Sequence, residues 1–172
     1  MANNYTTDAV ELLKKLIATP SVSRSETDAA DIMEQAMRDY GLTPQRHGNN
    51  LWVTSPTWDS SRPTILLNAH IDTVKPVATW TRDPFTPIIE EHCNEATGEL
   101  EHRLYGLGSN DCGGGLVALL QVFRQLTSNA TSVNNSSTTS ISNSNATSIN
   151  KNTPNSHGII KGTNLIYLAS CE

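Results

Sequence analysis

The fold is set by the stretch Thr64-Ile-Leu-Leu-Asn-Ala-His-Ile-Asp72. Its first six residues are almost all apolar, which predicts a buried, central strand of a largely parallel sheet. His70 and Asp72 follow at the end of this strand. Side chains two residues apart on an extended backbone point to the same side, so the imidazole and the carboxylate can converge on one point beyond the sheet edge. The stretch therefore predicts a metal site, in which one of the two side chains binds the ion and the other orients the side chain that binds it.

Two further carboxylates follow segments of the same kind. Asp111 ends the glycine-punctuated loop Leu104-Tyr-Gly-Leu-Gly-Ser-Asn-Asp111, and Glu172 ends the strand-like run Asn164-Leu-Ile-Tyr-Leu-Ala-Ser-Cys-Glu172. In an open α/β sheet the binding crevice lies outside the carboxyl ends of the strands, where such groups meet. Oxygen donors together with one imidazole suit zinc or a similar divalent ion.

The glycine-rich loop before a helix is also compatible with phosphate binding, because free N–H groups at a helix N-terminus favour anions. The pattern Gly106-x-Gly108-x-x-Asp111 lacks the third glycine of the dinucleotide fingerprint, however, and no Gly-Lys-Ser/Thr follows it. Nucleotide binding is therefore the minor alternative.

Apolar periodicity and turn residues predict alternating helices and strands. The expected helices begin at Asp8, at a Ser25 cap and at Leu116, and the expected strands cover residues 51–54, 64–69, 88–91, 100–105 and a final run from Asn164. This order predicts an α/β fold with a mixed, mainly parallel sheet flanked by helices.

Residues 127–157 stand apart in composition, since 23 of these 31 residues are Ser, Thr or Asn. Such a segment buries too little apolar surface to offset the entropy lost on ordering. It also occupies a helix-to-strand connection, where only a few residues are usual. We therefore predict a disordered surface insertion.

Charge and composition exclude several classes of partner. The net charge of -5 disfavours binding to nucleic acid or to anionic membranes, because both are bound through clustered Lys and Arg side chains. Residues 1–20 lack a continuous apolar core of a signal peptide, and no apolar run of 18 residues is present, so we expect neither secretion nor a membrane span. Three cysteines without a C-x-x-C pair fit a reducing compartment, and the cytoplasm is the expected location.

Four motifs together resemble a known enzyme family. They are His70-Ile-Asp-Thr-Val74, Trp80-x-x-Asp-Pro-Phe85, Leu104-Tyr-Gly-x-Gly-x-x-Asp111 and Leu168-Ala-Ser-Cys-Glu172. In this order the chain resembles the N-terminal part of the zinc-dependent acetylornithine deacetylase, succinyl-diaminopimelate desuccinylase, aminoacylase and carboxypeptidase family. The residues of the motifs are most similar to the acetylornithine deacetylase branch.

The resemblance implies a role for each candidate residue. His70 would bind one metal ion, Asp72 would orient its imidazole, Asp111 would bridge two ions next to a cis peptide bond, and Glu172 would be the general base. The family pattern continues with a second glutamate, another acidic ligand and a distant histidine, which lie beyond this sequence. The resemblance therefore implies that residues 1–172 form the N-terminal part of a zinc exopeptidase-like catalytic domain, incomplete on its own.

The resemblance also implies an activity, which is hydrolysis of the amide bond of an N-acyl amino acid with two zinc ions, or with cobalt in their place. The expected substrate is a small N-acetyl- or N-succinyl-ornithine-like molecule of arginine biosynthesis, with no nucleic acid or membrane as partner. A homodimer through a downstream domain is a further expectation. The alternatives are a related carboxypeptidase, dipeptidase or desuccinylase, and an inactive metal-binding fragment.

Overall fold

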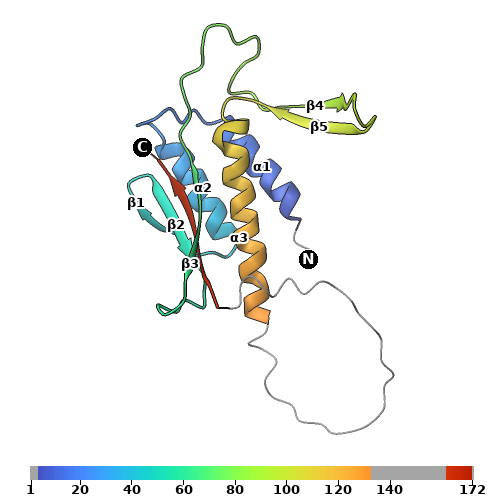
Figure 1. The fold of residues 1–172 in the computed structure, drawn as a ribbon. Helices are drawn as coiled ribbons and strands as arrows, with labels where there is room; N and C mark the ends of the chain where they lie inside the picture. Colours follow the sequence, from blue (N-terminus) through green and yellow to red (C-terminus); the bar gives the residue numbers. More distant parts are fainter. Residues whose placement is uncertain (1–3, 133–161, 172) are drawn as a thin grey trace, which may run out of the picture.

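The computed structural model describes residues 4–132 and 162–171 (Figure 1). Within these ranges the chain forms three α-helices, six strands and one irregular turn. The helices are α1 (Tyr5–Ile17), α2 (Thr27–Asp39) and α3 (Gly114–Ser132), and the turn η1 (Ser109–Gly113) leads into α3. The strands are β1 (Gln45–His47), β2 (Asn50–Thr54), β3 (Thr64–His70), β4 (Ile88–Cys93), β5 (Leu100–Tyr105) and β6 (Asn164–Ser170).

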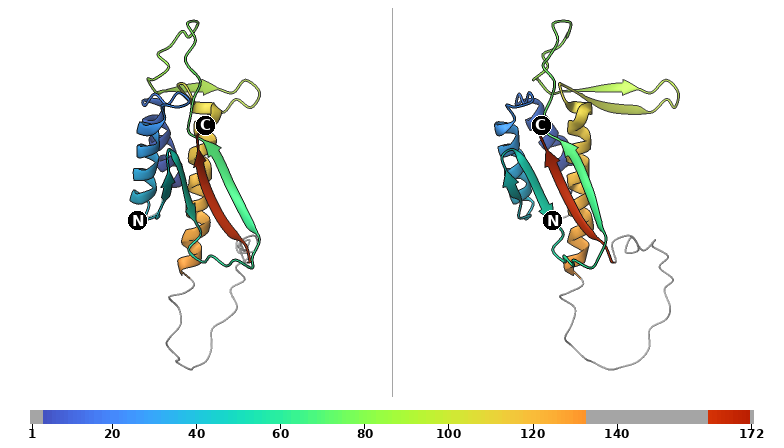
Figure 2. Two further views of the ribbon diagram at one scale, coloured as in Figure 1. Left: turned by 90° about the vertical axis from the view of Figure 1, so that its left-hand side faces the viewer. Right: turned by 60° about the vertical axis from the view of Figure 1, so that its left-hand side comes forward.

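The main sheet has the strand order β1-β2-β6-β3. The predicted mixed sheet is confirmed: β6 runs parallel to β3 and antiparallel to β2, and β1 pairs antiparallel with β2. Figure 2 shows β3 and β6 side by side with their carboxyl ends at the same edge. Among the described strands, antiparallel pairs outnumber the one parallel pair, so the expectation of a mainly parallel sheet is corrected.

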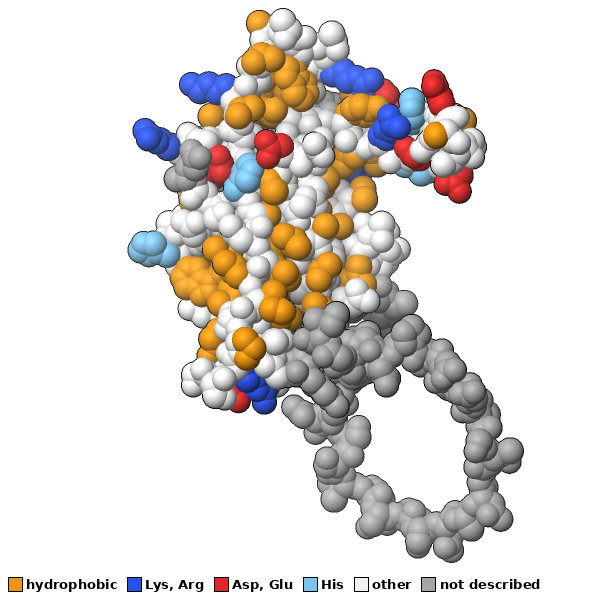
Figure 3. Space-filling view, viewed as in Figure 1, with side chains coloured by type: hydrophobic (Ala, Val, Ile, Leu, Met, Phe, Trp, Pro, Cys, Tyr) orange, Lys and Arg blue, Asp and Glu red, His pale blue; other side chains and the backbone are white. Residues whose placement is uncertain are grey.

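The predicted central place of β3 is also wrong within the described part of the chain, because β3 is the edge strand and β6 lies inside the sheet. The apolar side chains of β3 alternate between the two faces of the sheet. Ala69 is buried against the helices, whereas Leu66 points to the opposite face and is 53% exposed. Hydrophobic side chains accordingly lie open on the face shown in Figure 3. An apolar run alone does not distinguish an edge strand from a central one.

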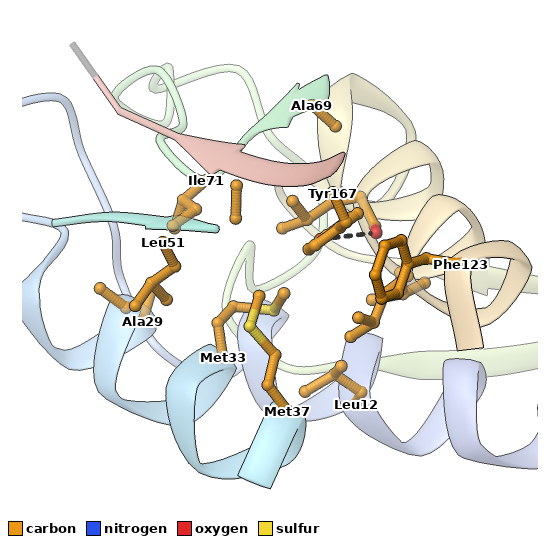
Figure 4. Close-up of a cluster of buried hydrophobic side chains, with 14 of the residues drawn as sticks. Leu12, Ala29, Met33, Met37, Leu51, Ala69, Ile71, Phe123 and Tyr167 are labelled. Carbon is orange, nitrogen blue, oxygen red and sulfur yellow. Dashed lines mark hydrogen bonds between the residues drawn. The ribbon is translucent and has the colours of Figure 1, made fainter. Parts of the chain in front are cut away.

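All three helices lie on one side of this sheet and enclose the core (Figure 4). Helices α2 and α3 contact the strands, and α1 packs against α2 and α3. Apolar spacing gives α1 and α2 one buried face each, as the sequence predicts for α2 with Ala29, Met33 and Met37. Tyr167 of β6 is fully buried beside Phe123 of α3, with ring centroids 6.5 Å apart. The contact between these two rings packs α3 against the middle of β6.

The hairpin β4–β5 forms a separate two-stranded sheet that projects from the main body (Figure 1). Its antiparallel register pairs Ile88 with Tyr105 and Cys93 with Leu100. The predicted turn lies between the two strands, and Gly98 there has a φ of 72°. The hairpin and its turn are therefore as expected from the sequence, with β4 longer by two residues at its end.

Helix ends differ from the expectations. The first helix begins earlier, after an Asn4 side chain that accepts a hydrogen bond from the Thr7 N–H at 3.2 Å. The residue before α2 is Glu26 rather than Ser25, and it makes no side-chain cap. None of the helices in residues 4–132 and 162–171 has the length and apolar character needed to cross a membrane.

Helix α3 continues to Ser132, which corrects the predicted start of the disordered insertion at Thr127. Thr127 is buried, so packing of its side chain favours continuation of the helix into polar sequence, and its hydroxyl is satisfied by donating to the Phe123 carbonyl oxygen at 2.8 Å. Residues 133–157 of the predicted insertion lie outside the described part of the chain.

Candidate metal centre

Two parallel strand ends bring the candidate site together. The register places His70 of β3 beside Ser170 of β6, and the Ile71 N–H donates to the Ser170 carbonyl oxygen at 2.8 Å. Cys171 therefore follows β6 next to the residues that carry His70 and Asp72. Glu172 comes directly after Cys171 in the sequence and lies outside the described residues, so its role as general base stays a prediction.

His70 and Asp111 face each other across the opening of the site. The Nε2 atom of His70 lies 3.2 Å from Oδ1 of Asp111, although the two residues are 41 positions apart. The Asp111 side chain is 87% exposed and that of His70 is 41% exposed. The Asp111–Cys112 peptide bond is cis, as the resemblance implied. The two predicted metal ligands are therefore neighbours at the surface of the described structure.

The other ring nitrogen of His70 faces only acceptors. Nδ1 lies 2.9 Å from the Asp72 carbonyl oxygen and 3.3 Å from Oδ1 of the Asp72 carboxylate. Because both oxygens accept hydrogen bonds, Nδ1 carries the proton in neutral His70. The Nε2 lone pair is then directed toward Asp111.

This arrangement fits a divalent cation. In neutral His70 the Nε2 lone pair and the Asp111 carboxylate are two acceptors in contact, and only a proton or a cation between them makes the contact favourable. Two ligands of one tetrahedral zinc ion at about 2.0–2.1 Å lie about 3.3 Å apart, close to the observed 3.2 Å. The donor set therefore fits zinc with respect to these two ligands.

The pKa of His70 reflects the same surroundings. Burial lowers the pKa, but the hydrogen bonds to Asp111 and to the Asp72 backbone raise it more, with further help from both carboxylate charges. The pKa of His70 consequently lies above its ordinary value of 6.5. A proton on Nε2 and a metal ion compete for one position between His70 and Asp111.

The loop that delivers Asp111 depends on two glycines. Gly108 has a φ of 78°, and a Cβ at this position would lie 2.7 Å from the Thr73 methyl group. Gly106 has a φ of 151° and packs against Ile17, which leaves no room for a side chain. The glycine pattern thus serves a positive φ and close packing of the loop on its neighbours.

A cleft of about 340 Å³ opens in front of these groups. Its walls include His70, Asp72, Trp80, Gly106 and Asp111. Within residues 4–132 and 162–171, no group of three or more His, Cys, Asp or Glu side chains is arranged to hold a metal ion. The described part of the chain therefore contributes two converging donors rather than a complete coordination shell.

Sequence reasoning missed one residue of this site, Ser23. Its hydroxyl donates to Oδ2 of Asp72 at 2.7 Å, from a loop 49 positions away in the sequence. Asp72 is only 8% exposed, and its Oδ1 atom is buried without a hydrogen-bond donor among the described residues. A serine after Pro20 carries no sequence signal that distinguishes it from an ordinary loop serine.

The cysteines beside the site are free thiols. Cys112 and Cys171 are half-buried, and Cys93 is exposed on the hairpin. Burial raises the pKa of the Cys171 thiol, and the negative charge of the buried Glu26 raises it further. The Cys171 thiol is thus held in its neutral form, so the thiolate, which reacts and binds soft metals, is disfavoured.

Known proteins with a similar sequence or fold include metallopeptidases and related hydrolases, which agrees with the candidate metal site formed by His70 and Asp111. Residues 66–137 match the model of Peptidase family M20/M25/M40. Over these residues the chain is similar to this family. Over 117 residues it is 33% identical to the succinyl-diaminopimelate desuccinylase of Pseudomonas syringae pv. syringae, covering 64% of this chain and 28% of that protein. Over 133 residues it is 32% identical to the acetylornithine deacetylase of Klebsiella pneumoniae, covering 68% of this chain and 31% of that protein.

Solved structures show the same fold. The chain aligns over 99% of its length with an M20 family metallo-carboxypeptidase from Sulfolobus solfataricus, with a TM-score of 0.55, 17% identity and 31% of that chain covered. A dinuclear metal binding M20 peptidase from Bacillus subtilis aligns over 97% of this chain and 35% of its own, with a TM-score of 0.53 and 12% identity. This chain thus spans about a third or less of the length of these relatives.

Proposed function

We propose that the protein hydrolyses the amide bond of an N-acyl amino acid with a divalent metal ion, zinc by preference, with cobalt able to replace it. The observation that carries the proposal is the 3.2 Å approach of His70 Nε2 to Asp111 Oδ1, with the Nδ1 atom of His70 turned to Asp72. The match of residues 66–137 to the M20 family supports a hydrolase. The description of one structural relative as dinuclear metal binding supports a pair of ions.

In this proposal the side chains divide the work. His70 and Asp111 would hold the metal, Asp111 would be the ligand shared if two ions bind, and Asp72 keeps the imidazole in the Nδ1–H form. A bound zinc ion supplies a Lewis acid that polarises the substrate carbonyl and acidifies water. Glu172 accepts a proton from the attacking water and delivers it to the amide nitrogen as the C–N bond breaks. The products are a carboxylic acid and a free amine.

The proposed substrate is an N-acetyl- or N-succinyl-ornithine-like molecule, which would place the protein in arginine biosynthesis. The identities of 33% with a desuccinylase and 32% with a deacetylase are too similar to separate the two substrate classes. N-succinyl-diaminopimelate, a substrate of the lysine route, is therefore the second candidate. Carboxypeptidase and dipeptidase activities are the remaining candidate activities to be tested.

The test is an assay of the whole protein with zinc or cobalt on N-acetylornithine, N-succinyl-diaminopimelate and a dipeptide. We expect one acyl amino acid to be cleaved, and we expect His70→Ala and Asp111→Ala each to lower kcat/KM by about 100-fold or more. His92→Ala, which removes an exposed histidine of the hairpin, is the matched control. Metal binding without hydrolysis of any of these substrates would instead identify a non-catalytic metal-binding protein.

A further inference from the structure

The loop from Ser21 to Glu26 runs alongside the residues that follow β3. Val22 forms an isolated parallel bridge with Thr73. Around this bridge the Thr73 N–H donates to the Ser21 carbonyl oxygen at 2.8 Å, and the Ser23 N–H donates to the Thr73 carbonyl oxygen at 3.3 Å. The loop therefore acts as a short extra strand whose position relative to Asp72 is set by backbone hydrogen bonds.

Attachment of this loop does not require the Ser23 hydroxyl. Besides the backbone bonds, the Ser21 hydroxyl donates to the Ile71 carbonyl oxygen at 3.3 Å. The Ser23 hydroxyl instead donates to Asp72 Oδ2 at 2.7 Å, and in the described residues this is its one side-chain hydrogen bond. Its contact is therefore with the carboxylate that faces His70.

The backbone next to Ser23 is strained. Arg24 has a φ of 75° and is, in the described ranges, the one non-glycine residue with a positive φ. Such a conformation costs about 1 kcal/mol or more and is found where surrounding contacts enforce it. Those contacts come from Glu26, which is 1% exposed and accepts hydrogen bonds from the Arg24 N–H and, at 3.1 Å, from the Asn49 side chain. The loop is held so that Ser23 faces Asp72.

From these contacts we infer that Ser23 is a positioning residue of the metal centre. Its hydroxyl holds Asp72 Oδ2, which keeps the carboxylate beside the His70 ring with Oδ1 3.3 Å from Nδ1, while the Nδ1–H itself donates to the Asp72 carbonyl oxygen at 2.9 Å. The negative charge placed there favours the Nδ1–H form, which presents the Nε2 lone pair to the metal. The inference rests on the metal-dependent function proposed above. It assigns a role to the N-terminal loop, which lies outside the matched residues 66–137.

Removal of the hydroxyl has a defined consequence. Among the described residues, the Asp72 carboxylate would lose its one hydrogen-bond donor, although Asp72 is only 8% exposed. A buried carboxylate without donors turns toward any available N–H or water, because leaving it unpaired is costly. His70 would then keep the Asp72 carbonyl oxygen at 2.9 Å but lose the carboxylate charge 3.3 Å from Nδ1, and loss of such a neighbouring carboxylate lowers metal affinity by about 10–100-fold.

The experiment compares Ser23→Val with Ser23→Thr in the whole protein, since the two side chains have the same shape and differ in the hydroxyl. Zinc affinity is measured by calorimetry, and the His70 Nδ1 proton is followed by NMR. We expect Ser23→Val to weaken zinc binding by about 10-fold or more and Ser23→Thr to stay within about twofold of the original protein. In Ser23→Val the Nδ1 proton should also move upfield and exchange faster with water.

The matched control is Ser61→Val, because the Ser61 hydroxyl donates to Asp59 Oδ1 at the same 2.7 Å but away from His70. Zinc affinity of this variant should not change. Equal zinc affinity and an unchanged Nδ1 proton in Ser23→Val and Ser23→Thr would overturn the inference. If the original protein neither binds zinc nor cleaves any substrate, the proposed function fails, while the Nδ1 proton still decides the role of Ser23.

Discussion

At the scale of single residues, the properties of His70 follow from the acceptors that surround its ring. The Asp72 carbonyl and carboxylate face Nδ1, so the nitrogen that meets Asp111 is the one with the lone pair. The same logic applies in the core, where a buried polar atom needs a fixed partner. Tyr167 illustrates this point, because its hydroxyl donates to the Leu116 carbonyl oxygen at 3.0 Å from a fully buried position.

We predict that Tyr167→Phe destabilises the protein by about 1–1.5 kcal/mol, because the ring packing stays while the hydrogen bond from the Tyr167 hydroxyl to the Leu116 carbonyl oxygen is lost. The measurement is urea unfolding followed by circular dichroism, with Tyr105→Phe on the hairpin as the control. Burial raises the pKa of Tyr167 well above its ordinary value, so its hydroxyl stays protonated and the effect should not vary between about pH 6 and 9. A change below about 0.3 kcal/mol would contradict the importance assigned to this hydrogen bond.

At the scale of elements, Arg46 connects β1 to α2. Its guanidinium pairs with Asp31 and Glu34 of α2, and Glu34 pairs in turn with Arg38. The Arg46 Nε–H also donates to the Gly48 carbonyl oxygen at 2.8 Å, which holds the turn between β1 and β2. These partners explain why the short strand β1 keeps its place beside the helix.

The contribution of these ion pairs to the stability of the fold depends on pH through Glu34. The hydrogen bonds from Arg38 and Arg46 lower the pKa of Glu34 below its ordinary value of 4.5. A lowered pKa in the folded state stabilises the fold above pH 4.5, and the gain is lost as the pH falls through the folded pKa.

We therefore predict that Glu34→Gln costs about 0.5–1 kcal/mol at pH 7, and that its stability converges with that of the original protein as the pH falls below 4.5. The measurement is a set of urea unfolding curves between pH 7 and about pH 3. Glu11→Gln, which removes the exposed partner of Lys14, is the matched control and should have little effect at any pH. A constant difference across this range would refute the assignment to Glu34.

At the scale of the whole molecule, the site lies where two parallel strand ends and the Asp111 loop meet, as Figures 1 and 2 show for the elements involved. Its two converging donors belong to separate segments of the chain. The Asp111 side chain is 87% exposed, and no third His, Cys, Asp or Glu side chain joins the two donors among the described residues. Metal affinity would therefore rest on His70 and Asp111 within the described part of the chain.

We predict that the 172-residue chain binds zinc weakly and has little hydrolase activity. Complete four-ligand sites contribute about 10–16 kcal/mol, so two ligands should contribute about half, which corresponds to a Kd of roughly 1–200 μM. Calorimetry with zinc, repeated on His70→Ala, measures this value, and an assay on N-acetylornithine measures the activity. A nanomolar Kd, or rapid turnover by the 172-residue chain, would show that further ligands complete the site.

Several features could be predicted because the signal is local. The apolar run before His70 predicts a strand, the Glu-Ala-Thr-Gly sequence predicts the hairpin turn, and the spacing of Ala29, Met33 and Met37 predicts the buried face of α2. The pair His70 and Asp72 could be placed at a strand end for the same reason. The meeting of His70 with Asp111 was inferred from the strand-end rule and the family resemblance, and the structure places the two side chains in contact.

Other features depend on contacts between distant segments. The edge position of β3 depends on which strand β6 joins, and the extension of α3 past Leu126 is favoured by burial of the Thr127 side chain. The role inferred for Ser23 depends on the β-bridge between Val22 and Thr73, which no local sequence pattern predicts. Periodicity and turn residues act over a few positions and so establish elements and candidate ligands from the sequence alone. Strand order, helix ends and the support of Asp72 are decided by burial and hydrogen bonding between remote residues, which exist only in the folded chain.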